Sequence, residues 1–402
     1  MRSYLDLLKT PGVGRILAAQ LTARFPFGMI SLAFLIHIEQ VYDSYTAAGI
    51  VLGVMSIGQA VAGPLTSRLM GRWGMRLVIS ITVALCTASI VLMALLQLPI
   101  VGLVLLGLVA GLTTPPIQPA VRTIYPKMVN STQLSPLFSL DASAQEIIWV
   151  LGPVVATLVS IQVSSVAGIL VAAAFLAGGG LWFVLSPELG RVRIPRSKRK
   201  LGAVLKRPPV LLSTIVGFML VAAAAALEAG IVATFGHGSP NSGWVLAIFA
   251  AGSLVGGLAL GHRPIGPWAL ANRMLIVTIG IGLASVWLNF WWLSATLFLA
   301  GIGIAPAFAV LFAIVSSSVK FSDTAEAYGW VGTGQLIGAA LGSSIAGFTI
   351  DNYGPSSALL VAGAFAALGT LIPALGRRWH PDLRGKDLSS IPDTAPVAAQ
   401  PS

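Results

Sequence analysis

The chain alternates between long apolar stretches and short polar connections. Twelve of these stretches have about the 20 residues that a helix needs to cross a bilayer. They are continuously apolar rather than alternating, which argues against the strands of a membrane barrel and predicts helices. The pattern therefore predicts an all-α membrane protein with twelve transmembrane helices. The predicted spans are residues 13–37, 46–69, 77–97, 100–119, 137–160, 164–185, 210–235, 242–261, 270–289, 291–316, 325–349 and 355–376.

The positive charges between these spans fall on one side. When the chain is threaded back and forth with its N-terminus inside, 23 of the 24 Lys and Arg residues lie at inner ends or in inner loops. Arg24, in the middle of the first span, is the exception. Positive residues favour the cytoplasmic side, so we expect both termini to be cytoplasmic.

Composition narrows the function classes. Of the 402 residues, 56% are hydrophobic and 9% are charged, whereas soluble proteins carry about 25% charged residues. The net charge of +11 comes from loops and tails, so we predict no nucleic-acid partner. Cys86 is the single cysteine, and the sequence has no hydrolase, metalloprotease or phosphate-loop motif. We therefore expect no enzyme activity, no metal and no cofactor.

A basic segment divides the chain into two halves of six spans each. It carries eight Lys and Arg residues and is the longest connection between spans. After the last span the sequence becomes polar and rich in Pro, Ala and Ser, which is typical of disorder. The predicted parts are an N-terminal six-helix bundle over 1–185, a basic cytoplasmic linker over 186–209, a C-terminal six-helix bundle over 210–378, and a cytoplasmic, mostly disordered tail over 379–402.

An internal repeat supports the two halves. A shift of 190 residues superimposes several Gly and Pro positions from three different spans without gaps. Parallel repeats of this kind are related by an axis along the membrane normal. We interpret the recurring glycines as close packing contacts between helices, with a sliding contact as the alternative. The aligned pairs are Ser67 and Gly257, Gly71 and Gly261, Gly111 and Gly301, Pro116 and Pro306, and Gly152 and Gly342.

Four charged residues inside or near the spans are the leading site candidates: Arg24, Glu146, Glu228 and Glu326. A charge at membrane depth costs about 2.5–3.5 kcal/mol, so it persists when it is paired or faces water. Arg24 lies about eleven residues, or 16 Å, from the inner end of its helix, and Glu146 lies about nine residues from the inner end of its own. At these similar depths the two side chains can form an ion pair if the first and fifth helices are neighbours. Such a pair is either a structural salt bridge or part of a substrate or proton site.

The two other glutamates have different surroundings. Glu228 has no cation at similar depth in its half, so we predict that it carries protons; the alternative is a protonated carboxyl bonded to the backbone. Glu326 and Asp141 lie near predicted helix starts, where a carboxylate favours the helix dipole. Trp149 and Trp330 follow one turn after Glu146 and Glu326 and line a cavity or simply pack.

Proline and glycine predict interruptions in three spans. Interrupted helices at matching places in two halves indicate the binding region of a transporter. The predicted breaks are at Pro26 and Gly28 beside Arg24, at Pro116 in the fourth span, and at Pro306 in the tenth.

Several motifs resemble those of the major facilitator superfamily. The loop from Ser67 to Arg76 is similar to the family's G-x-x-x-D-R-x-G-R-R pattern, with Arg72, Gly74 and Arg76 as matching gating candidates. The acidic position of the pattern is Gly71 here. Gly152–Pro153 resembles the core of the antiporter signature in drug-efflux branches. Residues 23–29, 324–330 and Pro115–Pro116 with Arg122 resemble a bacterial efflux-permease-like branch.

The resemblance implies two six-helix bundles, alternating access, and a central cavity lined by the first, fourth, seventh and tenth helices. It also implies that the fifth helix lies beside the first. We therefore predict a secondary transporter of the bacterial inner membrane that exports a small organic molecule in exchange for protons. Its expected partners are that substrate, protons and the lipid bilayer, and we expect a monomer. The alternatives are an uptake symporter or facilitator for a sugar or metabolite, and a membrane sensor or scaffold that transports nothing.

Overall fold

The computed structural model describes residues 2–236 and 239–394. Within these residues twelve helical spans follow one another, as the sequence predicted. The first half contains α2 (Val13–Arg24), η1 (Phe25–Gly28) and α3 (Ile30–Tyr42) as one interrupted span, then α4 (Tyr45–Trp73), α5 (Met75–Leu95), the interrupted span α6 (Ile100–Leu112), α7 (Ile117–Ile124) and η2 (Tyr125–Lys127), then α8 (Ser131–Gln162) and α9 (Ser165–Leu185).

The second half has the same order of spans. It contains α11 (Pro208–Phe235), α12 (Pro240–Leu260), α13 (Ala269–Ala284), α14 (Phe290–Ser318), α15 (Phe321–Tyr353) and α16 (Pro355–Leu375). Shorter helices lie outside the spans: α1 (Arg2–Lys9), α10 (Pro187–Arg191), η3 (Ala203–Lys206) and η4 (Arg377–Trp379). In the described part of the chain, ten spans are long and apolar enough to cross a membrane by themselves; α13 is shorter, and α15 is not among the ten.

Local chemistry sets the helix ends. Ser44 and Ser164 start α4 and α9 by accepting backbone N–H groups with their hydroxyl oxygens, at 3.1 Å and 3.0 Å. Asn289 does the same for α14 at 2.9 Å. Gly74 and Gly354 end α4 and α15 with φ of +90° and +83°, a backbone region that side chains disfavour.

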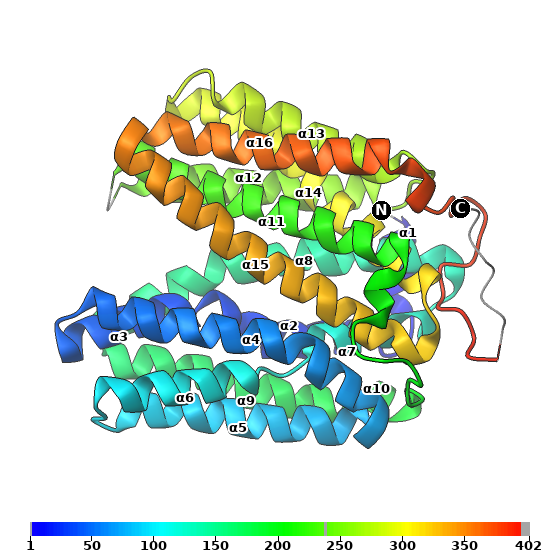
Figure 1. Cartoon of the computed structure of the whole chain (residues 1–402), viewed down its shortest axis with the longest axis horizontal. Coiled ribbons are helices and arrows are strands. Elements are labelled where there is room, and N and C mark those ends of the chain that lie inside the picture. Colours follow the sequence, from blue (N-terminus) through cyan, green and yellow to red (C-terminus); the bar gives the residue numbers. More distant parts are fainter. Residues whose placement is uncertain (1, 237–238, 395–402) are drawn as a thin grey trace.

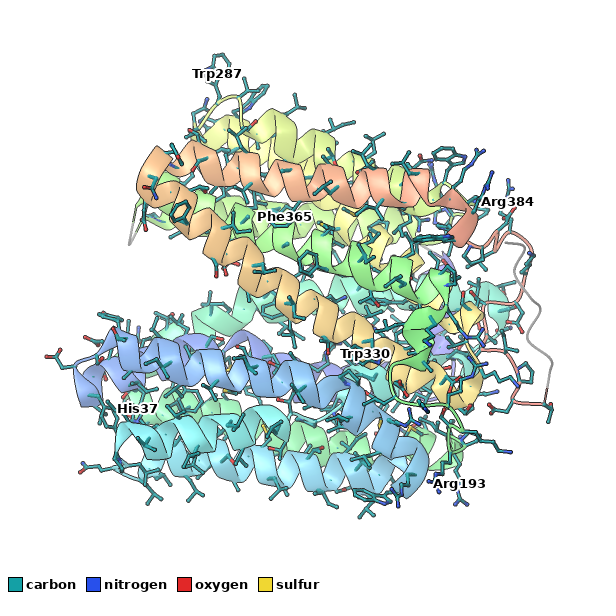
Figure 2. All side chains as sticks on the ribbon, in the orientation of Figure 1. His37, Arg193, Trp287, Trp330, Phe365 and Arg384 are labelled. Atoms are coloured by element: carbon teal, nitrogen blue, oxygen red, sulfur yellow. The ribbon has the colours of Figure 1, made fainter. Side chains whose placement is uncertain are left out.

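The two halves touch at one end of the molecule and diverge at the other (Figure 1). We name the first end, which carries both described termini and the segment 192–207, the inner end. There α4 packs against α15, and α8 packs against α12 and α14. Figure 2 places Arg193 and Arg384 at the inner end and Trp287 at the opposite, outer end.

Hydroxyl groups seal the inner end by bonding to carbonyl groups of the other half. Ser135 and Ser139 of α8 donate to the carbonyls of Gly261 and Gly257, at 2.8 Å and 2.7 Å. Tyr4 of α1 also donates to the Gly257 carbonyl, at 2.9 Å. These contacts hold the inner end of α12 against α8 and α1. On the other side of the seam, the Thr333 hydroxyl of α15 donates to the Ala60 carbonyl of α4 at 2.6 Å.

The repeat glycines form equivalent close crossings within each half. A side chain at Gly152 of α8 would collide with the backbone of Gly28 in η1. At the equivalent position, a side chain at Gly342 of α15 would collide with the Ala222 carbonyl of α11. Each glycine therefore lets the fifth span of its half lie directly on the first. Because both partners belong to the same half, the packing interpretation fits these two positions better than a sliding contact.

The prediction of a helix break at Pro306 is wrong. The break at Pro116 exists, because residues 113–116 separate α6 from α7. Its repeat partner Pro306 lies inside the continuous helix α14. Proline frees the carbonyl of residue Ile302, and that carbonyl packs directly on the backbone at Gly256 of α12. The Pro306 carbonyl also accepts Arg273 Nη1 at 3.0 Å, so neighbouring helices hold the turn in place.

The tail after α16 differs from the predicted disorder. The Leu383 amide donates to the Ile265 carbonyl at 3.0 Å, and Ile391 exchanges two 3.0 Å hydrogen bonds with Val319 and Phe321. Leu383 and Leu388 are buried by this contact, and apolar burial explains why the segment packs. The part of the predicted tail beyond residue 394 lies outside the described residues.

Candidate functional site

Arg24 is the last residue of α2, where the first span turns into η1. Its side chain is buried, with Nη1 donating to Gln20 Oε1 at 2.8 Å and Nη2 donating to Gln145 Oε1 at 2.5 Å. The nearest carboxylate is that of Asp141, 3.7 Å from Nη1. The predicted pair of Arg24 with Glu146 is therefore not formed in this structure.

Asp141 is shared between two guanidinium groups. Arg122 Nε donates to Asp141 Oδ2 at 3.1 Å, and Gln20 and Tyr125 donate to Oδ1 at 2.9 Å and 3.2 Å. Asp141 lies ten residues into α8, so the predicted role at a helix start is wrong. We name Arg24, Arg122 and Asp141 the charge cluster. It contains two cations and one anion, all buried.

Sequence reasoning placed Arg122 at an inner helix end and missed it as part of the site. Arg273 is a further buried cation in α13, so Arg24 is not alone in lying away from solvent. A signal for the cluster does exist in the sequence. Gln20 and Arg24 on α2, and Asp141 and Gln145 on α8, each form a polar pair four residues apart. Such pairs occupy one helix face, so each helix presents a polar face at this level.

The charge cluster touches the second half. The Arg122 guanidinium lies over the Phe312 ring of α14, with Cζ 3.3 Å from the ring centroid. The Phe312 carbonyl in turn accepts the Tyr328 hydroxyl of α15 at 2.9 Å. The second half therefore covers the cluster at the inner seam, and separation of the halves at that end would uncover it.

Glu146 bonds across the seam instead of within its half. Its Oε1 accepts the Ser253 hydroxyl of α12 at 3.0 Å. Trp149 lies one turn further along α8. Viewed down the helix axis, its side chain points between those of Gln145 and Glu146, and it is 54% exposed. It is therefore directed toward the seam, beyond the sealed part, where the halves diverge.

Glu228 is exposed on α11, and its carboxylate has no hydrogen bond or ion pair with the residues that the structure describes. It lies eleven residues, or three turns, beyond Gly217 on the same helix face. At Gly217 this face packs against Leu311 of α14 and Gln335 of α15. Both helices border the first half, so Glu228 is on the side of α11 that faces the seam.

Glu326 forms a contact between the halves. It lies in the second turn of α15, with its carboxylate accepting Arg68 Nη1 of α4 at 2.9 Å and the Gly202 amide at 2.7 Å. These contacts with α4 and the linker are additional to the favourable position near a helix start that the sequence predicts for Glu326. Nearby, Asp323 accepts the Ser197 hydroxyl at 2.6 Å. We name the contacts of Glu326 with Arg68 and Gly202 the inner latch.

Trp330 packs on the linker beside this latch. Its ring carbon Cζ2 would lie 3.6 Å from a side chain added at Gly202, and Figure 2 places Trp330 where the two halves meet. Its position favours packing over the alternative of lining a cavity.

The linker lies directly on the last turn of α4. A side chain at Gly71 would place its Cβ 3.0 Å from the Pro195 carbonyl, so the position of the family's acidic residue is filled here by linker backbone. Arg72 is exposed beside it, and Arg76 Nη2 donates to the Ser186 carbonyl at 3.2 Å within the first half. Gly74 serves the turn that ends α4.

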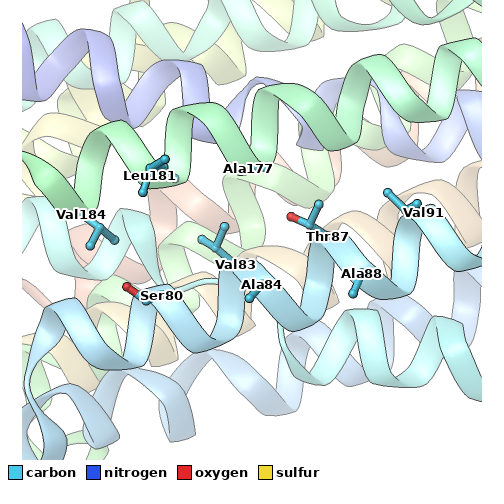
Figure 3. A pocket seen from close by; sticks show the side chains of 10 residues that line it. Ser80, Val83, Ala84, Thr87, Ala88, Val91, Ala177, Leu181 and Val184 are labelled. Atoms are coloured by element: carbon cyan, nitrogen blue, oxygen red, sulfur yellow. The ribbon is translucent and has the colours of Figure 1, made fainter.

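A separate groove of about 470 Å³ lies on the outside of the first half between α5 and α9 (Figure 3). Its walls are almost entirely apolar, from Val83 and Val91 on α5 to Leu181 and Val184 on α9. None of the site residues described above lines it, so it is a membrane-facing groove rather than part of the charge cluster.

The fold and the sequence both match known transporters. The family model described as Major Facilitator Superfamily matches residues 16–289 and 224–399. No curated protein matches the sequence. Similar solved structures include a bacterial homologue of the iron transporter ferroportin in the outward-facing state (TM-score 0.72, 13% identity, 90% of this chain and 98% of that chain).

Two further structures have a similar fold. They are the human organic anion transporter MFSD10 (TETRAN), with TM-score 0.68, 14% identity and coverage of 90% of this chain and 98% of that chain, and the proton:xylose symporter XylE, with TM-score 0.66, 13% identity and coverage of 94% and 97%. Identities this low establish a shared fold and nothing finer. The family match spans nearly the whole sequence, and the chain therefore belongs to the major facilitator superfamily.

Proposed function

We propose that this secondary transporter exports a small organic molecule in exchange for protons, in the inner membrane of a bacterium and with both termini in the cytoplasm. The observation that carries the proposal is the state of two carboxylates at membrane depth. Glu228 has no cation partner among the described residues, and Glu146 bonds only a hydroxyl group across the seam. Carboxylates in such places mark proton pathways in pumps and transporters.

The arrangement of the halves supports alternating access. The inner end is closed by hydroxyl–carbonyl bonds and by the inner latch, while the outer end diverges (Figure 1). Glu146 lies at the boundary between the closed and the diverging parts. A rocking motion that opens the inner end would break its bond to Ser253 and change what surrounds its carboxyl group.

The charge cluster favours a substrate with one negative charge. Arg24 and Arg122 share the single carboxylate of Asp141, so one positive charge is left over. The neighbouring Phe312 and Tyr328 add an aromatic surface. An organic anion with an apolar or aromatic body would satisfy the extra guanidinium once the inner end opens.

Proton exchange can be tested with aryl sulfonates, which remain charged and do not carry protons across the bilayer themselves. Proteoliposomes would be loaded with an aryl sulfonate and with the pH dye pyranine. We expect outward movement of the sulfonate to acidify the lumen, whereas a symporter would make it more alkaline. An aryl trimethylammonium compound of the same size should produce no signal.

Two variants test the residue assignment. Glu228→Gln should abolish the acidification but keep sulfonate counterflow. Glu39→Gln makes the same chemical change at the outer end of α3 and should behave as the parent protein. If Glu228→Gln acidifies the lumen at the parental rate, Glu228 is not the proton carrier.

A further inference from the structure

A groove at the inner end lies between α4 and the linker. It has a volume of about 310 Å³ and is separate from the charge cluster. Its walls combine two leucines with three arginines and a hydroxyl group, and no carboxylate from the described residues lines it. We name it the linker groove; its lining residues are Leu65, Arg68, Leu69, Arg72, Arg196 and Ser197.

Two of the three arginines have no counterion among the described residues. Arg68 is neutralised by Glu326 in the inner latch. Arg72 of α4 and Arg196 of the linker are exposed, and neither makes an ion pair or a hydrogen bond with a described residue. The two positive charges at one groove repel each other, and an anion between them would attract both and offset this repulsion.

The groove changes from apolar to basic along one face of α4. Leu65, Leu69 and Arg72 are spaced by four and three residues, so their side chains lie above one another on the helix. Leu65 is 41% exposed within the span, and Arg72 follows about 10 Å further along, where α4 leaves the membrane. This order matches a phospholipid, whose acyl chains adjoin the leucines while its phosphate reaches the arginines.

We propose that the linker groove binds the phosphate group of an anionic phospholipid. Arg72 and Arg196 hold the phosphate oxygens with their guanidinium groups, and the Ser197 hydroxyl lies beside them. Leu65 and Leu69 contact the first part of an acyl chain. Basic pockets at the cytoplasmic ends of membrane helices bind anionic headgroups through this chemistry.

The bound phosphate would fasten the linker to the first half. Arg196 and Ser197 belong to the linker, whereas Arg72 belongs to α4, so one phosphate bridges the two. The same stretch of linker reaches the second half, where Ser197 bonds Asp323 and Gly202 bonds Glu326. An anionic lipid in the groove therefore supports the closed inner end from the membrane side.

The experiment compares lipid binding by the purified full chain in native mass spectrometry. The probes are phosphatidylglycerol, phosphatidylcholine and inorganic phosphate. The test variant is Arg72→Ala with Arg196→Ala, and the matched control is Arg193→Ala with Lys200→Ala. The control removes two exposed linker cations that do not line the groove, so both variants lose the same net charge.

We expect the parent and the control to retain phosphatidylglycerol in preference to phosphatidylcholine. Each arginine near a membrane surface contributes about fivefold in affinity, so the test variant should bind phosphatidylglycerol about 30-fold more weakly. Equal binding by the test variant and the parent would overturn the proposal. So would equal retention of the two lipids by the parent. If millimolar inorganic phosphate displaces phosphatidylglycerol, the groove is a site for free phosphate, and the lipid assignment is wrong.

Discussion

Neutralising Glu326 should loosen the closed inner end of the transporter. Its carboxylate is 3% exposed and joins α15 to Arg68 of α4, whose side chain is 28% exposed. Glu326→Gln keeps the size of the side chain and an oxygen that can still accept the Gly202 amide, but it removes the charge. The variant therefore weakens the bond between the halves while leaving the linker contact in place.

The expected magnitude follows from the geometry of this bond. A hydrogen bond between charged groups contributes about 1.5–3 kcal/mol. Because solvent reaches Arg68, we take the lower end of this range, about 1.5 kcal/mol. That free energy corresponds to about a tenfold change in the ratio of open to closed inner ends.

Spin labels on the two halves measure this ratio. Cys86 is buried and is the sole cysteine, so a Cys86→Ser background accepts labels at chosen positions. Thr132→Cys on α8 and His262→Cys after α12 place exposed labels on opposite halves at the inner end. In Glu326→Gln, the population at long inter-label distance should rise about tenfold relative to the short-distance population.

A second carboxylate provides the matched control. Burial disfavours the charged form of Glu188, but the hydrogen bonds from Arg15 and the backbone, together with the positive charges of Arg15 and Arg191, outweigh this effect. They lower the pKa of Glu188, so it is ionised at neutral pH. Arg15 lies on α2 and Glu188 on α10 at the start of the linker, so their contact does not involve the second half, and Glu188→Gln should leave the label distances unchanged. An unchanged distribution in Glu326→Gln, or an equal shift in Glu188→Gln, would refute the latch. Restoration by Arg68→Glu combined with Glu326→Arg would support it.

Three further outcomes follow from the structure. Asp141→Asn leaves two buried guanidinium groups without a counterion and should lower stability by about 3–5 kcal/mol in detergent unfolding; a parental melting temperature would contradict the charge cluster. Gly342→Ala should cost about 1–3 kcal/mol because its Cβ meets a carbonyl of α11, whereas Gly347→Ala, with open space around it, should cost nothing. Burial lowers the pKa of His380 below its ordinary value of 6.5, so the detached tail binds the proton more tightly. The tail contact is therefore fully present above pH 6.5 and is lost as the pH falls through the lowered pKa of His380. Hydrogen exchange of the amides of residues 383–391, corrected for intrinsic rates, should show this loss in the parent protein and not in His380→Phe.

The fold was predictable because the bilayer leaves few choices. A polypeptide in lipid must satisfy its backbone hydrogen bonds internally, so each apolar stretch forms a helix whatever side chains it carries. Helix ends were less predictable. The fifth span was predicted to begin at 137, but α8 begins at Ser131, because a membrane helix continues into polar surroundings when its neighbours support it. Because of this error of six residues, Asp141 was expected only one turn inside the helix start.

The site was only partly predictable, since sequence gives depth along a helix but not direction around it. Arg24 was found because a charge inside an apolar stretch is visible in the sequence. Its partner was not found, because Glu146 and Asp141 are five residues apart and point about 140° away from each other. Counting residues placed Glu146 at about the same depth as Arg24. The packing of α8 on α2, however, directs Asp141 toward Arg24, and Glu146 faces Ser253 instead.

We expect the extra positive charge of the cluster to connect the binding of an anion with the motion of the halves. A structural salt bridge needs one cation for Asp141, yet both Arg24 and Arg122 contact it. In the closed state the surplus charge is stabilised by the Phe312 ring, which belongs to the other half. Opening the inner end removes that ring, so the Arg122 guanidinium must then bind water or an anion. A substrate anion that takes the place of the ring would stabilise the open inner end, and its release would favour closure.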